Sequence, residues 1–138
     1  MPPGVYYIGD LCYVMGTEWD YFCDHCLDDG EHILPGDRRV ASYGTLYGDG
    51  TYPCSNGAWL GVDAGLIGCI KIFHIQDDKL TVEQLNKLGT VVVFNSPFET
   101  GVHNGVISFG HIEVNTNDDD SFEEDYDYEE DYDYEEEE

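Results

Sequence analysis

Short runs of alternating hydrophobic and polar residues, separated by glycine, asparagine and aspartate, dominate the first 117 residues of the chain. Residues 5–14 are rich in aromatic and β-branched side chains and are interrupted at Gly9-Asp10, which predicts two short strands or one bulged strand. From residue 38 to residue 75 the pattern predicts an antiparallel meander. Asp49-Gly50 and Asn56-Gly57 are its expected two-residue hairpin turns, because such turns need positive φ angles.

Two later segments are hydrophobic at both odd and even positions. Residues 66–73 therefore predict a central strand covered on both faces, and residues 91–94 predict a second buried strand. A last hairpin is expected to turn at Asn104-Gly105. Beyond it, Ile112 and Val114 alternate with polar neighbours, as on a strand with one buried face.

Two short helices interrupt the strand pattern. Thr17 is a candidate N-cap for the first helix, whose apolar positions recur at helical spacing. These positions are Trp19, Phe22, Cys23, Cys26 and Leu27. Residues 28–37 follow as a predicted polar loop. The second helix is expected over residues 81–88, capped by Thr81 and ended by Gly89.

This pattern, of about eight strands and two helices, predicts a mainly β (or α+β) fold. The expected architecture is an antiparallel sandwich or partly open barrel with one or two short helices packed on it. Residues 1–117 are enough for one compact domain. Residues 115–117 are the expected linker to residues 118–138, for which a disordered acidic tail is expected.

The tail carries 15 carboxylates and no cation, and the hexapeptide Asp-Tyr-Asp-Tyr-Glu-Glu occurs in it twice, at 125–130 and 131–136. A segment of this composition cannot bury enough apolar surface to offset the entropy lost on ordering. Its repeat tyrosines all fall at even positions, so an extended chain would present them along one edge. They are Tyr126, Tyr128, Tyr132 and Tyr134.

Two interpretations of the tail remain open: a solubilising, self-repelling segment, or a segment that docks on a basic protein. In the docking interpretation the carboxylates pair with Arg and Lys while the rings fill pockets or stack on guanidinium groups. Besides the four tyrosines, the expected contact residues are Asp125, Asp127, Glu129, Asp131 and Asp133. The tail resembles the histone-binding segments of nuclear chaperones and the phosphate-imitating surfaces of DNA mimics. Phosphorylation of its tyrosines is a third use.

The charge balance narrows the range of partners. The chain has 30 acidic residues and five Lys or Arg, a formal net charge of −25. Residues 1–117 hold all five cations and 15 of the acids, so this part alone is −10. Direct binding to nucleic acid and to anionic membranes is therefore disfavoured. The pattern contains no signal sequence and no apolar run of ~20 residues, which predicts a cytoplasmic or nuclear protein with reduced thiols.

Cys23 and Cys26 form a Cys-x-x-Cys motif. It is either half of a zinc site, with His32 as a nearby third ligand, or a pair of small core side chains. No second cysteine pair at comparable spacing completes four ligands, so the core interpretation is favoured. No cofactor-binding motif is present, and no cofactor is expected.

Asp10 and Asp63 each interrupt hydrophobic surroundings. Such a carboxylate is either a turn acceptor for backbone N–H groups or a buried functional acid, and the neighbouring Gly9 and Gly65 favour the turn. An acid or metal site built from Asp10, Asp63, His103 and His111 is the alternative, although no motif spacing supports it.

Three segments around these acids, at residues 7–14, 47–53 and 62–68, resemble a loose family of short proteins of bacteria, protists and large DNA viruses. No activity is known for that family. The resemblance implies that Asp10 and Asp63 belong to one structural motif. The function expected from the sequence is non-enzymatic binding of a basic protein, histone-like or otherwise rich in Arg and Lys. The alternative is a small β-fold hydrolase or ligand-binding domain that uses Asp10, Asp63 and a histidine.

Overall fold

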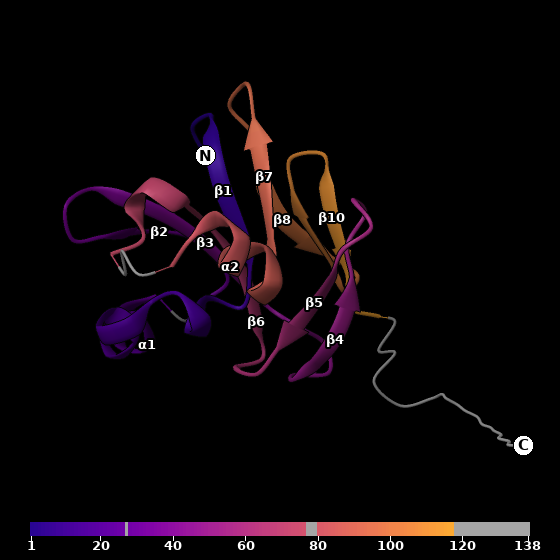
Figure 1. Cartoon of the computed structure of the whole chain (residues 1–138). Coiled ribbons are helices and arrows are strands. Elements are labelled where there is room, and N and C mark those ends of the chain that lie inside the picture. The colour runs from indigo at the N-terminus through magenta and orange to yellow at the C-terminus, as the bar shows by residue number, and fades with distance from the viewer. Residues whose placement is uncertain (27, 77–79, 118–138) are drawn as a thin grey trace, which may run out of the picture.

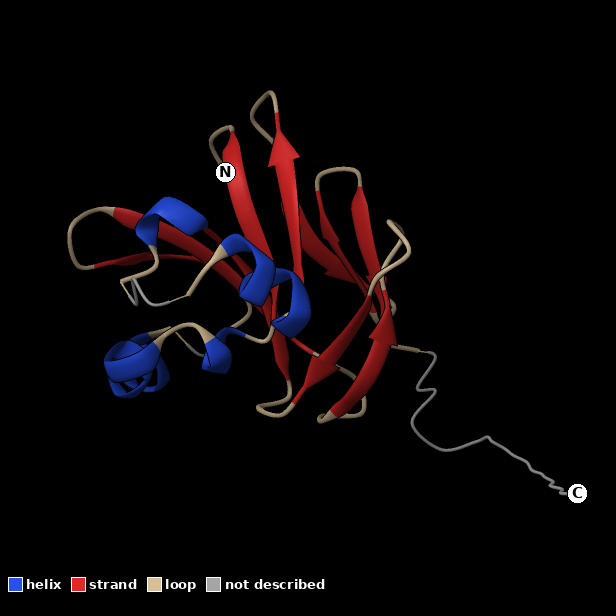
Figure 2. Cartoon of the chain, viewed as in Figure 1, coloured by secondary structure: helices blue, strands red, loops and turns tan. Residues whose placement is uncertain are grey.

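The structure, a computed structural model, describes residues 1–26, 28–76 and 80–117. These residues form a mainly antiparallel β fold in three layers, with helices on one side of a central sheet and two smaller sheets on the other (Figures 1 and 2). The mainly β, antiparallel class with two short α-helices is as the sequence predicts. No helix among the described residues is long and apolar enough to cross a membrane.

The central sheet has the strand order β2-β3-β6-β1-β7, and all its pairs are antiparallel. Its strands are β1 (Gly4–Gly9), β2 (Gly30–Leu34), β3 (Arg38–Gly44), β6 (Leu66–Lys71) and β7 (Thr90–Phe94). Strand β6 occupies the middle and is buried from Leu66 to Ile70, which confirms the predicted central strand. The strand ends earlier than its hydrophobic run, because Ile72–His74 turn into the 3₁₀ helix η3.

Two small sheets cover one face of the central sheet. They are the hairpin β4 (Gly50–Pro53) and β5 (Trp59–Val62), and the meander β8 (Thr100–His103), β9 (Val106–Phe109) and β10 (Ile112–Asn115). The core between them and the central sheet contains Tyr6, Cys69, Tyr52 and Phe109, all fully buried.

The opposite face is covered by helical segments. These are η1 (Leu11–Tyr13), η2 (Gly16–Glu18), α1 (Trp19–His25) and α2 (Val82–Leu88). A second core, with Tyr7, Phe22, Ile70 and Leu85 in it, lies between them and the sheet. Alternate residues of β1, such as Tyr6 and Tyr7, therefore enter different cores.

Several predicted elements are confirmed. Helix α2 begins after Thr81, which forms a capping box with Gln84, and ends at Gly89. Asn104 and Gly105 have φ angles of 50° and 80° and join β8 to β9 by a two-residue turn. In β10, Ile112 and Val114 are buried between exposed neighbours.

The predicted meander is wrong. Strand β3 pairs with β6, because its hydrophobic residues need the two-sided cover that only the central sheet gives, and β4 pairs only with β5. Asp49-Gly50 consequently joins no pair of neighbouring strands. Asn56-Gly57 does lie in the β4–β5 connection, but only Gly57 has a positive φ (94°), and a Cys54 N–H bond to the Ala58 carbonyl closes a longer loop.

Local expectations near the N-terminus and before the tail also need correction. After β1 the chain forms η1 rather than a second strand, because the Asp10 side chain caps that turn. Thr17 lies inside η2, and α1 has no side-chain cap. The predicted loop 28–37 contains β2. Asn115 ends β10 and Thr116 is fully buried, so residues 115–117 are not a free linker. Leu27 and the expected disordered tail, 118–138, lie outside the described residues.

Candidate functional site

Asp10 is a fully buried carboxylate at the end of β1. Its Oδ1 accepts a hydrogen bond from the Cys12 backbone N–H at 2.9 Å. Its Oδ2 accepts hydrogen bonds from the backbone N–H groups of Asp63 and Ala64, both at 2.7 Å. The geometry is that of a turn acceptor that ties the end of β1 to the β5–β6 turn, and it brings Asp10 and Asp63 into one structural motif, as the family resemblance implies.

The side chain of Asp63 is exposed, in contrast to that of Asp10. Its Oδ2 accepts a hydrogen bond of 2.6 Å from the Tyr13 hydroxyl. Burial, followed by the Asp63 hydrogen bond, raises the pKa of Tyr13. Tyr13 was not among the residues expected from the sequence, because it lies three residues after Asp10 in a segment whose helical turn was not predicted.

The thiol beside this pair is not activated. Burial, and then the hydrogen bond and charge of Asp10, raise the pKa of Cys12 to about 12. A thiol needs a lowered pKa to act as a nucleophile near neutral pH. The Asp10–Asp63 motif therefore ties two turns together and presents no activated nucleophile.

The two candidate histidines lie elsewhere. His111 sits in the β9–β10 turn with its ring edge-on to Phe94, at 5.6 Å between centroids. Phe94 pairs with Gly4, at the opposite end of β1 from Asp10, and the separation along the strand is about 20 Å. His103 is exposed, with Nε2 3.1 Å from Asn104 Nδ2. Among the described residues no hydrogen bond joins either histidine to Asp10 or Asp63.

The Cys-x-x-Cys pair is divided between core and surface. Cys26 is buried in the second core, between the helical segments and the central sheet, which we call the helix-side core. Cys23 is half-buried. Burial is the first cause that raises the pKa of both thiols. His32 Nε2 lies 2.6 Å from the Asp28 carbonyl oxygen. In the described part of the chain no three His, Cys, Asp or Glu side chains gather as metal ligands.

The charges of residues 1–117, which we call the body, leave little basic surface. Both arginines form ion pairs: Arg38 with Glu18, and Arg39 with Glu31 at 2.5 Å. Arg38 is also buried and donates to the Pro35 and His74 carbonyls. Its pKa is raised, first by the Glu18 hydrogen bond. These pairs neutralise the charge of both arginines, of which only Arg38 is buried.

Exposed aromatic and acidic residues lie beside the point where the tail begins. The Leu46 N–H donates to Thr116 Oγ1 at 3.3 Å, which holds residues 45–49 against the end of the described chain. In this loop Leu46 is 57% exposed and Tyr47 58% exposed, and Asp49 is exposed as well. The tail tyrosines and acids named above lie outside the described residues.

No family model, curated protein or solved structure matches the chain.

Proposed function

We propose that this protein is a non-enzymatic interaction protein that binds a basic protein partner, histone-like or otherwise rich in Arg and Lys, through its acidic tail and the loop beside the tail. The observation that carries the proposal is the concentration of 15 carboxylates and four regularly spaced tyrosines in residues 118–138. Carboxylates attract and orient a basic surface, and tyrosine rings provide the buried contacts that slow dissociation.

The body supports the same kind of partner. Tyr47 and Asp49 repeat the tail's combination of an aromatic ring and a carboxylate, and the Leu46–Thr116 bond holds their loop next to the start of the tail. We define residues 45–49 as the tail-side loop. Together the loop and the tail would form one continuous acidic and aromatic surface. A dense array of carboxylates also imitates a phosphate backbone, so the protein would compete with nucleic acid for its partner.

Truncation at residue 117 tests the proposal. The probe is a purified core histone, and binding is measured by titration with the intact and the truncated chain at the same salt concentration. Loss of at least 100-fold in affinity is expected if the tail supplies most of the contact. Circular dichroism of both chains checks that the body is still folded, and equal affinity of a folded truncated chain would overturn the proposal.

A paired substitution tests the contribution of the tail-side loop. Tyr47→Ser with Asp49→Asn should weaken histone binding by about three- to tenfold, as expected for an exposed rim contact. Val102→Ser is a matched control, because Val102 is exposed on β8 and lies outside this loop. Equal effects of the two variants would restrict the binding surface to the tail.

A further inference from the structure

A hydrophobic groove of about 700 Å³ opens where β1 begins and β6 ends. Its most prominent side chain is Phe73, in η3, which is 91% exposed. Solvation of a whole phenylalanine ring is unfavourable, and exposed apolar patches of this kind commonly mark contact sites. The groove is lined by Gly4, Val5, Lys71, Ile72, Phe73 and His74.

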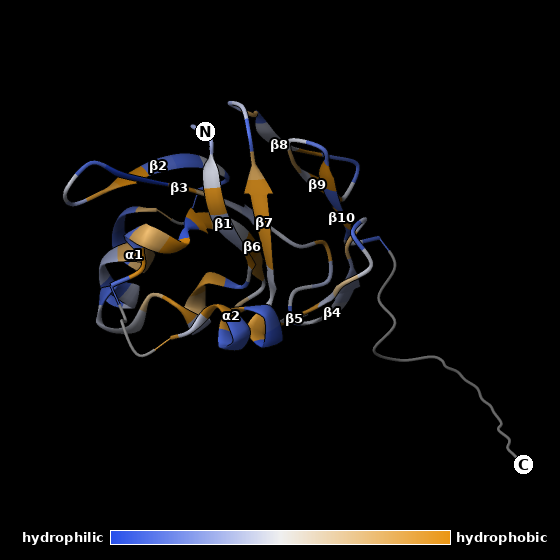
Figure 3. Cartoon of the chain, turned by 45° about the horizontal axis from the view of Figure 1, so that its top comes forward, coloured by the Kyte–Doolittle hydropathy of each residue, from blue (hydrophilic) through white to orange (hydrophobic). Residues whose placement is uncertain are grey.

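The sheet beside the groove is also uncovered. Val5 and Val93 face each other across the β1–β7 pair, and Val93 is 58% exposed. Two residues further along, Tyr7 and Val91 pack in the helix-side core. The helical layer therefore covers only one end of this strand pair. Figure 3 shows β7 as hydrophobic along its length, with α2 packed below it.

The charge at the groove is positive. No carboxylate among the described residues lies within ion-pair distance of Lys71, in contrast to Arg38 and Arg39. Burial, and then the charges of Lys71 and Arg38, lower the pKa of His74, so its imidazole is neutral at pH 7. Lys71 pairs with Tyr6, so its side chain leaves the sheet on the opposite face from Val5 and Val93 and borders the groove at the strand end, beside Ile72 and Phe73. A lysine beside the exposed Phe73 ring suits a ligand that combines a carboxylate with an aromatic ring.

We propose that the second repeat of the protein's own tail, residues 131–136, docks in this groove. The ring of Tyr132 or Tyr134 would pack on Phe73 and Val5, and a neighbouring carboxylate would pair with Lys71. The repeat supplies this combination, because each of its tyrosines stands between acidic residues. The contact goes beyond the proposed function and would compete with it for the second repeat, but it forms, and is tested, without a second protein.

Chain length selects the second repeat rather than the first. Thr116 contacts Leu46, and the neighbouring Thr45 N–H donates to the Gly65 carbonyl just before β6 begins, whereas Lys71 ends β6. The tail therefore starts at the opposite end of the central sheet from the groove.

The tail must pass around a body about 35 Å across, a path of roughly 50 Å. At about 3.4 Å per extended residue, Tyr128 reaches about 37 Å from Asn117, whereas Tyr132 and Tyr134 reach about 51 and 58 Å.

The net charge of the body opposes this contact only weakly at physiological salt. Charges more than about 8 Å away are largely screened, so the local groups decide the interaction. Among the described residues these local groups include Lys71 and the Arg38–Glu18 pair, which contacts the His74 carbonyl and is neutral in sum. Packing of a tyrosine ring on Phe73 does not depend on salt in the same way.

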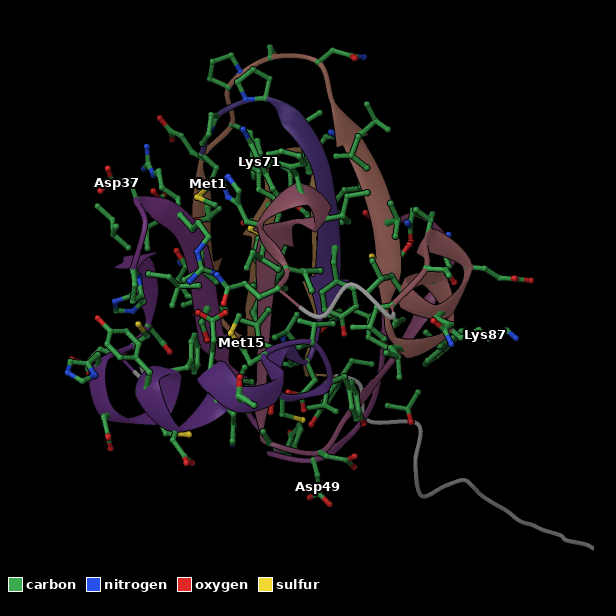
Figure 4. The ribbon with its side chains drawn as sticks, turned by 60° about the vertical axis from the view of Figure 1, so that its left-hand side comes forward. Met1, Met15, Asp37, Asp49, Lys71 and Lys87 are labelled. Carbon is green, nitrogen blue, oxygen red and sulfur yellow. The ribbon has the colours of Figure 1, made fainter. Side chains whose placement is uncertain are left out.

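Zero-length carbodiimide cross-linking of the full chain tests the proposal without a partner. The reagent joins an amine to a carboxylate only when the two are in contact. Lys87 is the internal control, because it lies on α2, away from the groove, and is exposed where Lys71 is half-buried (Figure 4). Without docking, Lys87 should react with the tail at least as well as Lys71. With docking, links from Lys71 to residues 131–136 should exceed those from Lys87 at least fivefold.

Matched variants and isotope mixing complete the test. Tyr132→Ser with Tyr134→Ser, or Phe73→Ser, should lower the Lys71 links at least threefold, whereas Tyr126→Ser with Tyr128→Ser should not. A mixture of ¹⁵N-labelled and unlabelled chains should give links within single chains. Lys71 links no stronger than those of Lys87, equal effects of the two tyrosine pairs, or links that join labelled to unlabelled chains would each overturn docking within one chain.

Discussion

At the scale of single residues, Asp10 shows how a buried carboxylate is tolerated without a cation. None of the described arginines or lysines pairs with it. Three backbone N–H groups compensate its charge instead, from η1 and from the β5–β6 turn. The neighbouring glycines made this turn role predictable from the sequence. The partner segment could not be predicted, because Asp63 lies 53 residues after Asp10 and only the folded sheet brings the two together.

Replacement of Asp10 should therefore destabilise the fold. Asp10→Ala leaves three N–H groups without their acceptor and should lower the free energy of unfolding by about 3 kcal/mol or more. Asp63→Ala removes only the exposed bond from Tyr13 and should cost about 1 kcal/mol or less. Urea unfolding of both variants measures the difference. Equal losses would show that the backbone bonds to Asp10 contribute little.

The buried thiol of Cys69 and the buried phenol of Tyr6 should make the fold less stable at high pH. Burial is the main cause that raises the pKa of Cys69 from 9.0 to about 12 and that of Tyr6 from 10.0 to about 12. The unfolded chain releases these protons first, so the stabilisation is complete below about pH 9 and falls as the pH rises toward 12. Cys69 alone should contribute a loss of about 1 kcal/mol by pH 10.

Urea unfolding at pH 7.5 and pH 10 checks this dependence. The Cys69→Ala variant should show a smaller fall in stability between the two pH values than the unmodified chain. An unchanged free energy of unfolding at pH 10 would contradict the raised pKa values.

At the scale of elements, local sequence signals predicted those parts of the fold that depend on local chemistry. The capping box of α2, the Asn104-Gly105 turn and the fully hydrophobic β6 are examples. Strand β2 was missed because it is an edge strand with exposed Glu31 and Ile33 and no clear alternation. The exposure of Phe73 was missed because the hydrophobic run gives no sign of where the strand ends.

The tight packing of β6 gives a prediction at this scale. A Cβ atom at Gly68 would lie 2.3 Å from the Ala41 carbonyl oxygen and 2.6 Å from Leu11 Cδ1. A backbone atom of the neighbouring strand cannot move aside easily, so Gly68→Ala should lower the free energy of unfolding by about 3 kcal/mol. Gly61→Ala on β5 is the matched control, because its Cβ would meet no atom within 4 Å. Chemical unfolding that shows equal stability for the two variants would refute the predicted clash.

At the scale of the whole molecule, the layered arrangement could not be predicted from the sequence. Strand β1 ends at Gly9 and lies between β6, which begins only at Leu66, and β7, which begins at Thr90. Pairings between segments so distant in the chain leave no local pattern. The same limit applies to the candidate sites. The acidic, tyrosine-containing tail is evident from the sequence. Only the structure places the tail-side loop beside the start of the tail, and the Phe73 groove at the far end of the central sheet.

The central claim is that the tail binds a basic protein through its tyrosine rings as well as its charge. Binding of a core histone at low and at physiological salt tests it with two variants. The first replaces Tyr126, Tyr128, Tyr132 and Tyr134 by Ser, which leaves the net charge unchanged. The second neutralises Asp125, Asp127, Glu129, Asp131 and Asp133 as amides.

The serine variant should bind about tenfold more weakly with nearly the same salt dependence, because the rings govern dissociation and the charges govern attraction. The amide variant should instead lose much of its salt dependence. An unchanged affinity of the serine variant would contradict the account and leave the tail as a charged, solubilising segment.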